Sequence, residues 1–423
     1  MKTELVRDTS NSAETPGENS RHATRAQLVA AFSSGRDCLL KLFAAYRDAL
    51  CADIRVNMSP ELNLPLWEMG HIAWFEEYWI ARNPLRAQGI NADHAAMENL
   101  RTASCLPNAD ARYDSSNVAH ATRWQLVLPS ADETLAYLAQ VRESTLALLH
   151  EMVIMPARNN DNALYFFRLA LFHEAMHREA WIYMAQTLGI ALDDSLNLSP
   201  MRPPNLPTDD CLIDAGRWRL GSTNTGFVFD NELCAHEVDV AAFAIDRAAV
   251  TWQRYLPFFE AGGYTNPQWW SGEGWEWRQQ QTLPRYLRRN GSQWQRYTFG
   301  QWLDLDLHLP AMNLTRHEAQ AWCQWAGRRL PSEAEWEMAA CTRPASEFFW
   351  GEVWEWTSSA FAPYAGFAPH PYRDYSMPWF DGRPVLRGAS LATDLVMRHP
   401  RYRNFFPAER NDIFSGFRSC AIW

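Results

Sequence analysis

Three histidines in two separate stretches constrain the fold of this chain most strongly. His173 and His177, in LFHEAMHREAW, are four residues apart, so on a helix both imidazoles project from one face. His71, in LWEMGHIAWFEEYW, lies far upstream and can join the pair only if two helices pack side by side. Three imidazoles that converge between helices would form a metal site with open positions, as catalytic sites have.

The surroundings of these histidines favour a ligand role over a purely structural one. An HxxxH spacing alone is weak evidence, and packed core histidines are the alternative. Each histidine lies in an apolar, aromatic segment, where an imidazole without a partner is costly to bury. Four nearby carboxylates are expected to bind the ring N–H groups: Glu76, Glu77, Glu174 and Glu179.

Apolar periodicity predicts four helices in the N-terminal part of the chain. The expected helices begin near Ala26, Leu64, Ser130 and Asn162, and the last ends at Gly189. Ser130 and Glu133 have the spacing of a capping box. The connection over residues 84–129 is expected to be long and irregular, which is typical of a functional segment. Four helices with one long crossover favour a bundle with a metal centre among the helices.

The sequence pattern changes from long helical periods to short strand-like runs after a segment rich in Pro and Asp. Residues 191–210 are expected to form a linker and residues 211–423 an α+β module of short strands with much irregular structure. Capping residues predict two short helices in this module, at Thr315 with Glu318 and at Ser332 with Glu335. The expected organisation is completed by a disordered tail at 1–25 and the helical bundle at 26–190.

Composition limits the partners and the compartment. The chain has 423 residues and a formal net charge of −10, without a long basic run, which argues against nucleic acid or an anionic membrane as a partner. We see no apolar run of membrane-spanning length and no signal-peptide pattern, so a cytoplasmic protein is expected. The eight cysteines form no CxxC pair, which favours free thiols over a disulfide framework.

Motifs in the C-terminal half resemble a known module. WCQWAGRRLPSEAEWEMAA (322–340), FFWGEVWEWTSS (348–359), VLRGAS (385–390) and IFSGFRS (413–419) are similar to the formylglycine-generating-enzyme-like (sulfatase-modifying-factor) module, which has a C-type-lectin-like fold. The N-terminal half resembles a DinB-type four-helix bundle. The two modules in this order resemble the non-heme iron sulfoxide synthases of ergothioneine biosynthesis. The formylglycine-generating oxidases themselves fit less well, because their cysteine pair is missing here.

This resemblance implies a reaction and roles for individual residues. It implies an oxidoreductase that holds Fe(II) with His71, His173 and His177 and uses O2 to join hercynine, at imidazole C2, to a thiol or selenol donor. A tyrosine that delivers a proton or hydrogen atom is expected in the family. Tyr372 and Tyr375, in PHPYRDYSMPWF, are the candidates for this catalytic role.

Departures from the ergothioneine-type pattern point to the donor. Met176 stands where these synthases usually carry Gln, and the Arg-Asn-Trp-Asp motif of many relatives reads Arg-Asn-Phe405-Phe406 here. The Asp of this motif, whose carboxylate would bind the ammonium group of an amino-acid donor, is replaced by Phe406. Two aromatic rings instead suit the apolar face of a sugar. Together with DARYDSSNVAHATRW (110–124) and WFEEYWIARNP (74–84), this resembles the selenoneine-synthase branch, which uses a selenosugar. Arg112 and Arg123 are further candidates for donor binding.

Three other functions are open at this stage. The first is an ergothioneine-type synthase with cysteine or γ-glutamylcysteine as the donor. The second is a DinB-type zinc thiol-transferase or hydrolase, because three histidines and water also suit Zn²⁺. The third is a sugar-binding protein whose histidine cluster is only structural.

Overall fold

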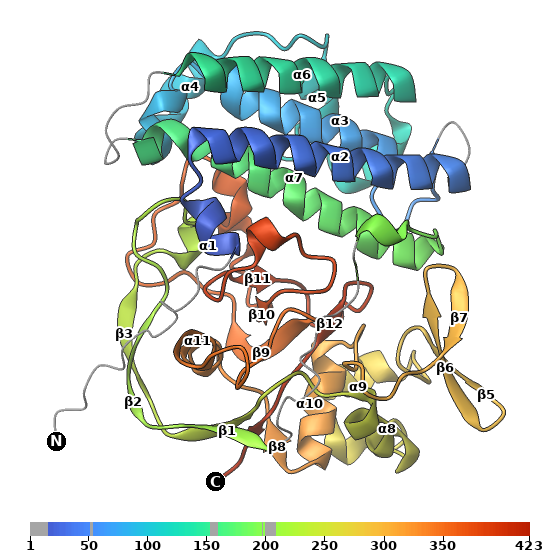
Figure 1. Cartoon of the computed structure of the whole chain (residues 1–423). Coiled ribbons are helices and arrows are strands. Elements are labelled where there is room, and N and C mark those ends of the chain that lie inside the picture. Colours follow the sequence, from blue (N-terminus) through green and yellow to red (C-terminus); the bar gives the residue numbers. More distant parts are fainter. Residues whose placement is uncertain (1–15, 51–53, 153–159, 197, 199–208) are drawn as a thin grey trace.

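The structure is a computed structural model that describes residues 16–50, 54–152, 160–196, 198 and 209–423. Figure 1 shows a layer of long helices at one end of the molecule and an α+β module packed beneath it. The predicted combination of a helical bundle and an α+β module is confirmed. None of the helices in the described part of the chain combines the length and apolar character needed to cross a bilayer.

The helical layer is built from four long helices. They are α2 (Arg25–Leu50), α3 (Pro65–Glu76), which continues as a π-helical turn (Glu77–Ala81), α6 (Ala131–Glu151) and α7 (Asn160–Leu188). Helix α3 packs against α6 and α7, and α2 packs against α7. The predicted capping box is present, because the Glu133 N–H donates to Ser130 Oγ and the Ser130 N–H donates to Glu133 Oε2. Gly189 ends α7 at a φ of 72°, as expected.

The connection between α3 and α6 is more ordered than its sequence predicts. It forms four short helices: η3 (Arg86–Asn91), α4 (His94–Leu100), α5 (Ala109–Tyr113) and η4 (His120–Gln125). They are too short to show a clear apolar period, and local caps such as Asp93 on the Ala96 N–H stabilise them. Helix α5 lies against α3 so closely that a Cβ at Gly70 would meet the Tyr113 ring at 2.2 Å. The connection therefore covers the face of α3 that carries His71.

The prediction of a disordered tail up to residue 25 is wrong from residue 16 onward. Residues 16–21 form helix α1 (Pro16–Arg21), and residues 1–15 lie outside the described residues. The buried Arg21 guanidinium donates to both carboxylate oxygens of Glu232 at 2.6 and 2.9 Å. Because this partner is remote in sequence, composition alone could not reveal it. Helix α1 thus fastens the start of the chain to the α+β module.

The α+β module contains small sheets and short helices. The sheets have the strand orders β1-β4-β13-β8, β11-β10-β9-β12, β2-β3 and β5-β6-β7. The strands are β1 (Asp210–Ile213), β2 (Gly216–Leu220), β3 (His236–Val240), β4 (Phe243–Asp246), β5 (Leu287–Asn290), β6 (Gln293–Thr298), β7 (Gln301–Asp304), β8 (Arg328–Arg329), β9 (Trp354–Ala360), β10 (Pro384–Gly388), β11 (Asn404–Phe405), β12 (Ser415–Gly416) and β13 (Cys420–Ala421). The helices are α8 (Trp252–Glu260), α9 (Gly272–Arg278), α10 (Arg316–Trp325) and α11 (Glu333–Thr342).

Other local predictions from the sequence hold. Both predicted capping boxes, at Thr315 and Ser332, are present. Seven of the cysteines lie in the described residues, and all seven are free thiols. Most of the predicted linker (197 and 199–208) lies outside the described residues.

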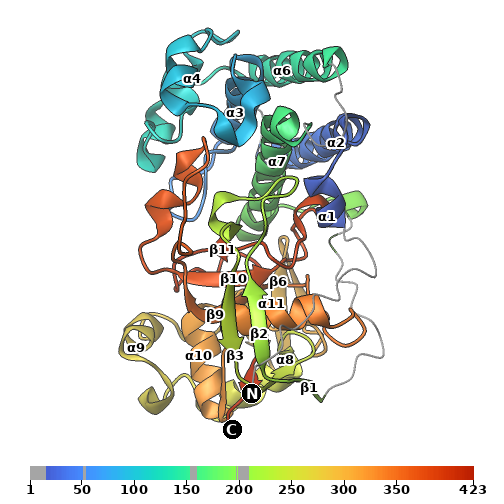
Figure 2. The same ribbon diagram turned by 90° about the vertical axis from the view of Figure 1, so that its left-hand side faces the viewer.

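Helix α7 joins the bundle to the module. Its Glu179 carboxylate accepts hydrogen bonds from Trp354 Nε1 at 2.7 Å and from the hydroxyls of Ser390 and Thr393 at 2.7 and 2.8 Å. Arg178 forms an ion pair with Asp394 of the same loop. In both Figure 1 and Figure 2, α7 is the long helix that lies next to the strands β10 and β11. The module therefore contacts the helix that carries two of the three histidines.

Candidate metal centre

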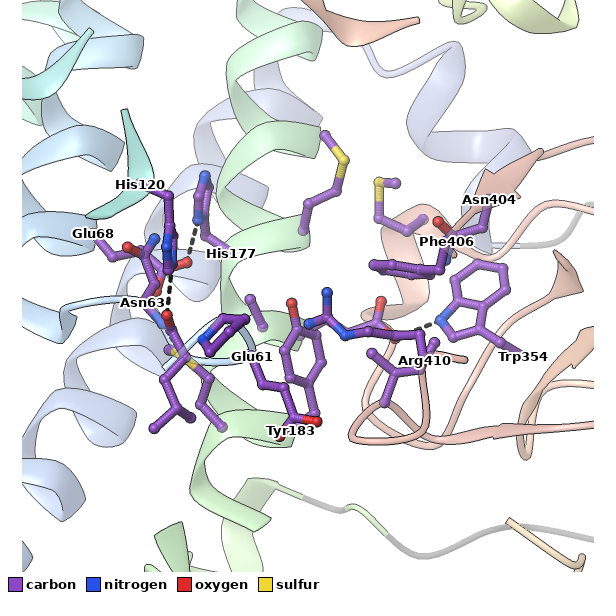
Figure 3. A pocket seen from close by; sticks show the side chains of 18 of the residues that line it. Glu61, Asn63, Glu68, His120, His177, Tyr183, Trp354, Asn404, Phe406 and Arg410 are labelled. Carbon is purple, nitrogen blue, oxygen red and sulfur yellow. Dashed lines mark hydrogen bonds and ion pairs between the residues drawn. The ribbon is translucent and has the colours of Figure 1, made fainter. Parts of the chain in front are cut away.

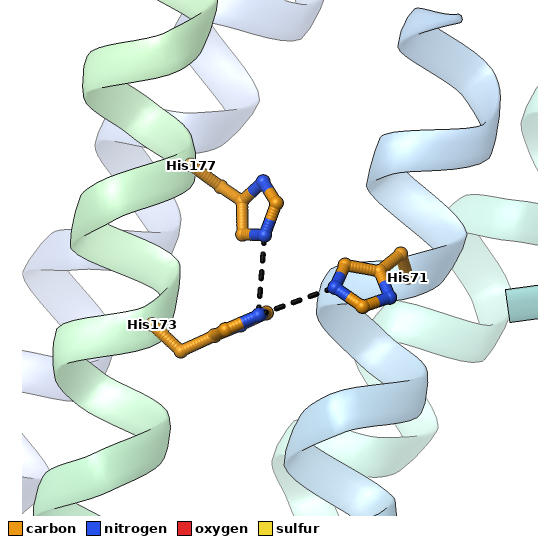
Figure 4. Close-up of side chains that lie close together, drawn as sticks. All are labelled: His71, His173 and His177. Carbon is orange, nitrogen blue, oxygen red and sulfur yellow. Dashed lines mark hydrogen bonds between the residues drawn. The ribbon is translucent and has the colours of Figure 1, made fainter. Parts of the chain in front are cut away.

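The three predicted histidines meet in space between α3 and α7 (Figure 4). The Nε2 atom of His173 lies 3.2 Å from His71 Nε2 and 3.1 Å from His177 Nε2. Ligand nitrogens held at about 2.1 Å from one ion at right angles are about 3 Å apart. These two distances match those between neighbouring ligands of one ion, and the ligand atoms of all three histidines lie within 4.8 Å of one another.

Aromatic packing fixes the orientation of two of the rings. The Trp67 ring, one helical turn before His71, stacks on that imidazole with a centroid distance of 4.9 Å and an interplanar angle of 9°. Phe75, one turn after His71, stacks on His173 of the other helix at 3.5 Å and 3°. The i, i+4 spacing on α7 places His177 beside His173. The apolar residues around the motifs thus hold the rings before any ion binds.

Hydrogen bonds on the outer side of the rings orient the lone pairs inward. His71 Nδ1 lies 2.7 Å from the carbonyl oxygen of Tyr113, and His177 Nδ1 lies 2.5 Å from Glu68 Oε1. Both partners are acceptors, so each Nδ1 carries the proton and each Nε2 presents its lone pair. Burial, together with the neighbouring His177, lowers the pKa of His71 and His173 well below the usual value. Imidazole nitrogens with converging lone pairs suit a cation.

The carboxylate that orients an imidazole is not one of the four expected. Glu76 and Glu174 instead bind Arg36 and Arg142 in a buried ion network. The other two carboxylates have partners elsewhere: Glu77 accepts from Tyr137 and Ser104, and Glu179 accepts from the module. All four point away from the ring N–H groups because the helical phase turns them toward other neighbours.

A cavity of about 350 Å³ lies beside His177, between α7 and the module (Figure 3). Three of the predicted substrate residues line it, namely Met176, Arg123 and Phe406. Other lining residues include Glu61, Asn63, Glu68, His120, Glu179, Tyr183, Trp354, Tyr402, Asn404 and Arg410. A substrate in this cavity would contact groups from both halves of the chain.

Arg123 is the cation in this cavity that lacks a carboxylate partner within the described part of the chain. Its guanidinium lies 3.7 Å from the centre of the Trp67 ring and donates to Asn63 Oδ1 at 3.1 Å. Burial lowers its pKa to about 10, and its Nε has no hydrogen-bond partner. By contrast, Arg410 forms an ion pair with Asp412. Arg123 is therefore the group best placed to bind an anionic part of a ligand.

Comparisons with known proteins agree with this architecture. The DinB superfamily model matches residues 31–180, and the sulfatase-modifying factor enzyme 1-like domain matches residues 197–352. The "Hercynine oxygenase" of Mycolicibacterium smegmatis is 30% identical over 87% of this chain and 93% of its own length. The chain belongs to the hercynine oxygenase family. The protein of that name from Mycobacterium tuberculosis is also 30% identical, over 93% of this chain and 98% of its own.

A solved structure is similar to part of the chain. PvdO from Pseudomonas aeruginosa matches 51% of this chain and 95% of its own, with 16% identity and a TM-score of 0.35. The predicted ergothioneine-type fusion of two modules is confirmed by the hercynine oxygenase relatives and by the two family models. The selenoneine branch stays a prediction.

Two of the predicted substrate residues lie outside the cavity of this hercynine oxygenase family member. Arg112 is directed to the carbonyl oxygens of Val127 and Pro107 at the surface, which satisfy its guanidinium. The Phe405 ring stacks on Phe361 at a centroid distance of 4.1 Å, because neighbouring residues of a strand face opposite sides. Phe406 alone of this pair therefore faces the cavity.

The two candidate tyrosines lie near the histidines but in different surroundings. The Tyr372 ring lies 5.0 Å from the Phe75 ring, which stacks on His173, and it lines a second cavity of about 310 Å³. The Tyr375 hydroxyl lies 3.0 Å from that of Tyr402, which in turn donates to Met176 Sδ at 3.7 Å. Tyr402, not predicted from the sequence, is thus the tyrosine of the three that lines the cavity beside His177.

The sequence analysis also missed Glu68, which bonds one histidine of the cluster. It lies three residues before His71, yet it bonds His177 of the other helix, so only the packing of α3 on α7 reveals the pair.

We expect Glu68→Gln to weaken metal binding about 10-fold, because loss of a partner carboxylate makes the imidazole a poorer ligand. Competition with a chromophoric chelator measures the Kd. The control is Glu61→Gln, whose carboxylate pairs with Arg285. Equal affinity in Glu68→Gln and wild type would contradict this role.

Proposed function

We propose that this protein is a non-heme iron enzyme that uses O2 to form a carbon–chalcogen bond at imidazole C2 of hercynine. The observation that carries the proposal is the convergence of three imidazoles beside a cavity shared by both modules. The similarity to hercynine oxygenases over most of the chain supports hercynine as the substrate.

The chemistry of the ligand set fits iron. His71, His173 and His177 would hold the ion, and three protein ligands are fewer than the six that iron accepts, which would leave positions for substrates. Iron in this site would supply redox chemistry with O2 and a centre that accepts a soft sulfur or selenium donor. The residues of the chain bind and orient the substrates and keep water away from them.

The walls of the cavity suit a betaine. Hercynine carries a trimethylammonium group, which aromatic faces attract through cation–π interaction. Trp354, Tyr402 and Phe406 supply such faces. Arg123, without a carboxylate partner among the described residues, is available for a substrate carboxylate. The trimethylammonium and the carboxylate share one carbon of hercynine, so these groups would bind the betaine end of the substrate.

The carboxylates of the cavity support a donor without an ammonium group. Glu61 pairs with Arg285, Glu68 bonds His177, and Glu179 accepts three hydrogen bonds from the module. An amino-acid donor would therefore compete with existing partners. We propose a selenosugar as the donor, with the Phe406 ring as a stacking surface. A thiol such as cysteine or γ-glutamylcysteine is the second candidate.

Mass spectrometry of aerobic reactions tests both parts of the proposal. Fe(II)-reconstituted protein is mixed with hercynine and one donor: a selenosugar, the matching thiosugar, cysteine or γ-glutamylcysteine. We expect a hercynine adduct, formed fastest with the selenosugar and absent without O2 or with histidine in place of hercynine. No adduct with any donor would overturn the reaction. A faster reaction with cysteine or γ-glutamylcysteine would overturn the donor assignment alone.

A further inference from the structure

The buried carboxylate of Asp230 accepts hydrogen bonds from both ends of the loop that carries Tyr372 and Tyr375. Asp230 lies in the single-turn helix η7 (Asp230–Glu232), far from the loop in sequence. Its Oδ2 accepts the backbone N–H of His370 at 3.3 Å, and its Oδ1 accepts the Ser376 hydroxyl at 2.5 Å. The two tyrosines lie between these two anchor points.

Neighbouring groups reinforce both anchor points. The amide of Asn231 donates to the Ser376 hydroxyl at 3.1 Å, and the Tyr165 hydroxyl of α7 lies 3.1 Å from His370 Nδ1. Asp230 is 2% exposed and forms no ion pair within the described part of the chain. Burial raises its pKa to about 6. Burial of a carboxylate without a paired cation costs free energy. A specific role for Asp230 at this position would account for that cost.

The loop held by Asp230 reaches the histidine cluster by two routes. Tyr372 contacts Phe75, whose ring stacks on His173. Tyr375 bonds the Tyr402 hydroxyl, which bonds Met176 between the two histidines of α7. The Tyr375 ring also stacks on Phe229, the residue before Asp230, at a centroid distance of 4.5 Å. A shift of either loop end would move both tyrosines relative to the cluster.

We propose that Asp230 is a positioning residue. It holds the loop 370–376 so that Tyr372 and Tyr375 keep their positions relative to the three-histidine centre. This inference rests on the proposed function for its catalytic consequence, but not for the loop geometry itself. The carboxylate needs both oxygen atoms for this task, one for each end of the loop. An amide at the same position would place an NH2 group against one of the two donors.

The experiment uses Asp230→Asn and Ser376→Ala, which change the acceptor and the donor of the Asp230–Ser376 hydrogen bond. Trypsin cleavage after the exposed Arg373, followed by mass spectrometry, reports on loop opening without any need for activity. We expect faster cleavage in both variants. We also expect kcat with hercynine to fall about 10- to 100-fold at nearly constant KM, because small misplacements of catalytic groups have effects of this size.

The matched control is Glu318→Gln. Glu318, in α10, is likewise fully buried and has a pKa raised to about 7, but its hydrogen-bond partners are Tyr264 and Thr315, which lie outside the loop 370–376. This variant should leave both readouts unchanged.

A double-mutant cycle tests whether the effect passes through the loop. In the background of Tyr372→Phe, Asp230→Asn should cost much less than in the wild type. An equal cost in both backgrounds, or unchanged cleavage at Arg373 in both anchor variants, would overturn the inference. If the wild type makes no hercynine product, the proposed function fails, and the cleavage rates still decide whether Asp230 holds the loop.

Discussion

Replacement of His173 by alanine is expected to remove the metal and to lower turnover about 10³-fold or more, since the ion supplies several kcal/mol of transition-state stabilisation. His173 is the central member of the cluster, with its Nε2 within 3.2 Å of both other Nε2 atoms. Loss of this ligand leaves two imidazoles on different helices. Metal analysis after gel filtration and the rate of hercynine consumption measure the two effects.

A histidine outside the cluster provides the control. His120 lines the cavity, but its Nε2 bonds the Leu62 carbonyl oxygen at 2.8 Å and lies outside the cluster. His120→Ala should therefore retain the metal. Thermal unfolding of both variants shows whether they are folded. Full metal content and turnover in folded His173→Ala would instead support a purely structural cluster.

Tyr372→Phe is expected to lower the rate of product formation about 10²- to 10³-fold, the size typical of a lost general acid. In the described structure the Tyr372 hydroxyl has no hydrogen-bond partner, and burial raises its pKa, so it stays protonated and able to donate. The phenylalanine ring preserves the contact with Phe75. Stopped-flow or steady-state rates with saturating hercynine and donor measure the effect.

Tyr375→Phe is the matched comparison for this variant. The Tyr375 hydroxyl already bonds Tyr402, so its removal should act on the position of that residue and have the smaller effect. If Tyr375→Phe is the more damaging of the two, the catalytic role moves to the Tyr375–Tyr402 pair. If neither changes the rate, neither hydroxyl delivers a proton.

Local patterns predicted the helices and the meeting of the histidines well. The i, i+4 spacing of His173 and His177 depends only on helix geometry, and apolar segments on both helices required that they pack together. Capping residues at Ser130, Thr315 and Ser332 identified helix starts, because they act within three residues.

Contacts between distant segments could not be read in this way. Glu68 bonds a histidine of another helix, whereas Glu76, five residues beyond His71, turns toward Arg36 and Arg142. The sequence analysis named Glu76 and not Glu68, because the spacing of residues along one helix does not reveal contacts with another helix. Helix α1 escaped detection for the same reason, since the Arg21–Glu232 pair joins residues far apart in the chain.

Oxygen uptake by protein reconstituted in parallel with Fe(II) and with Zn²⁺ tests the central claim most directly. The three-histidine centre is predicted to consume O2 only with iron, and only when hercynine and a selenol or thiol donor are both present. Activity with zinc that is indifferent to oxygen would contradict this account and favour a thiol-transferase or hydrolase.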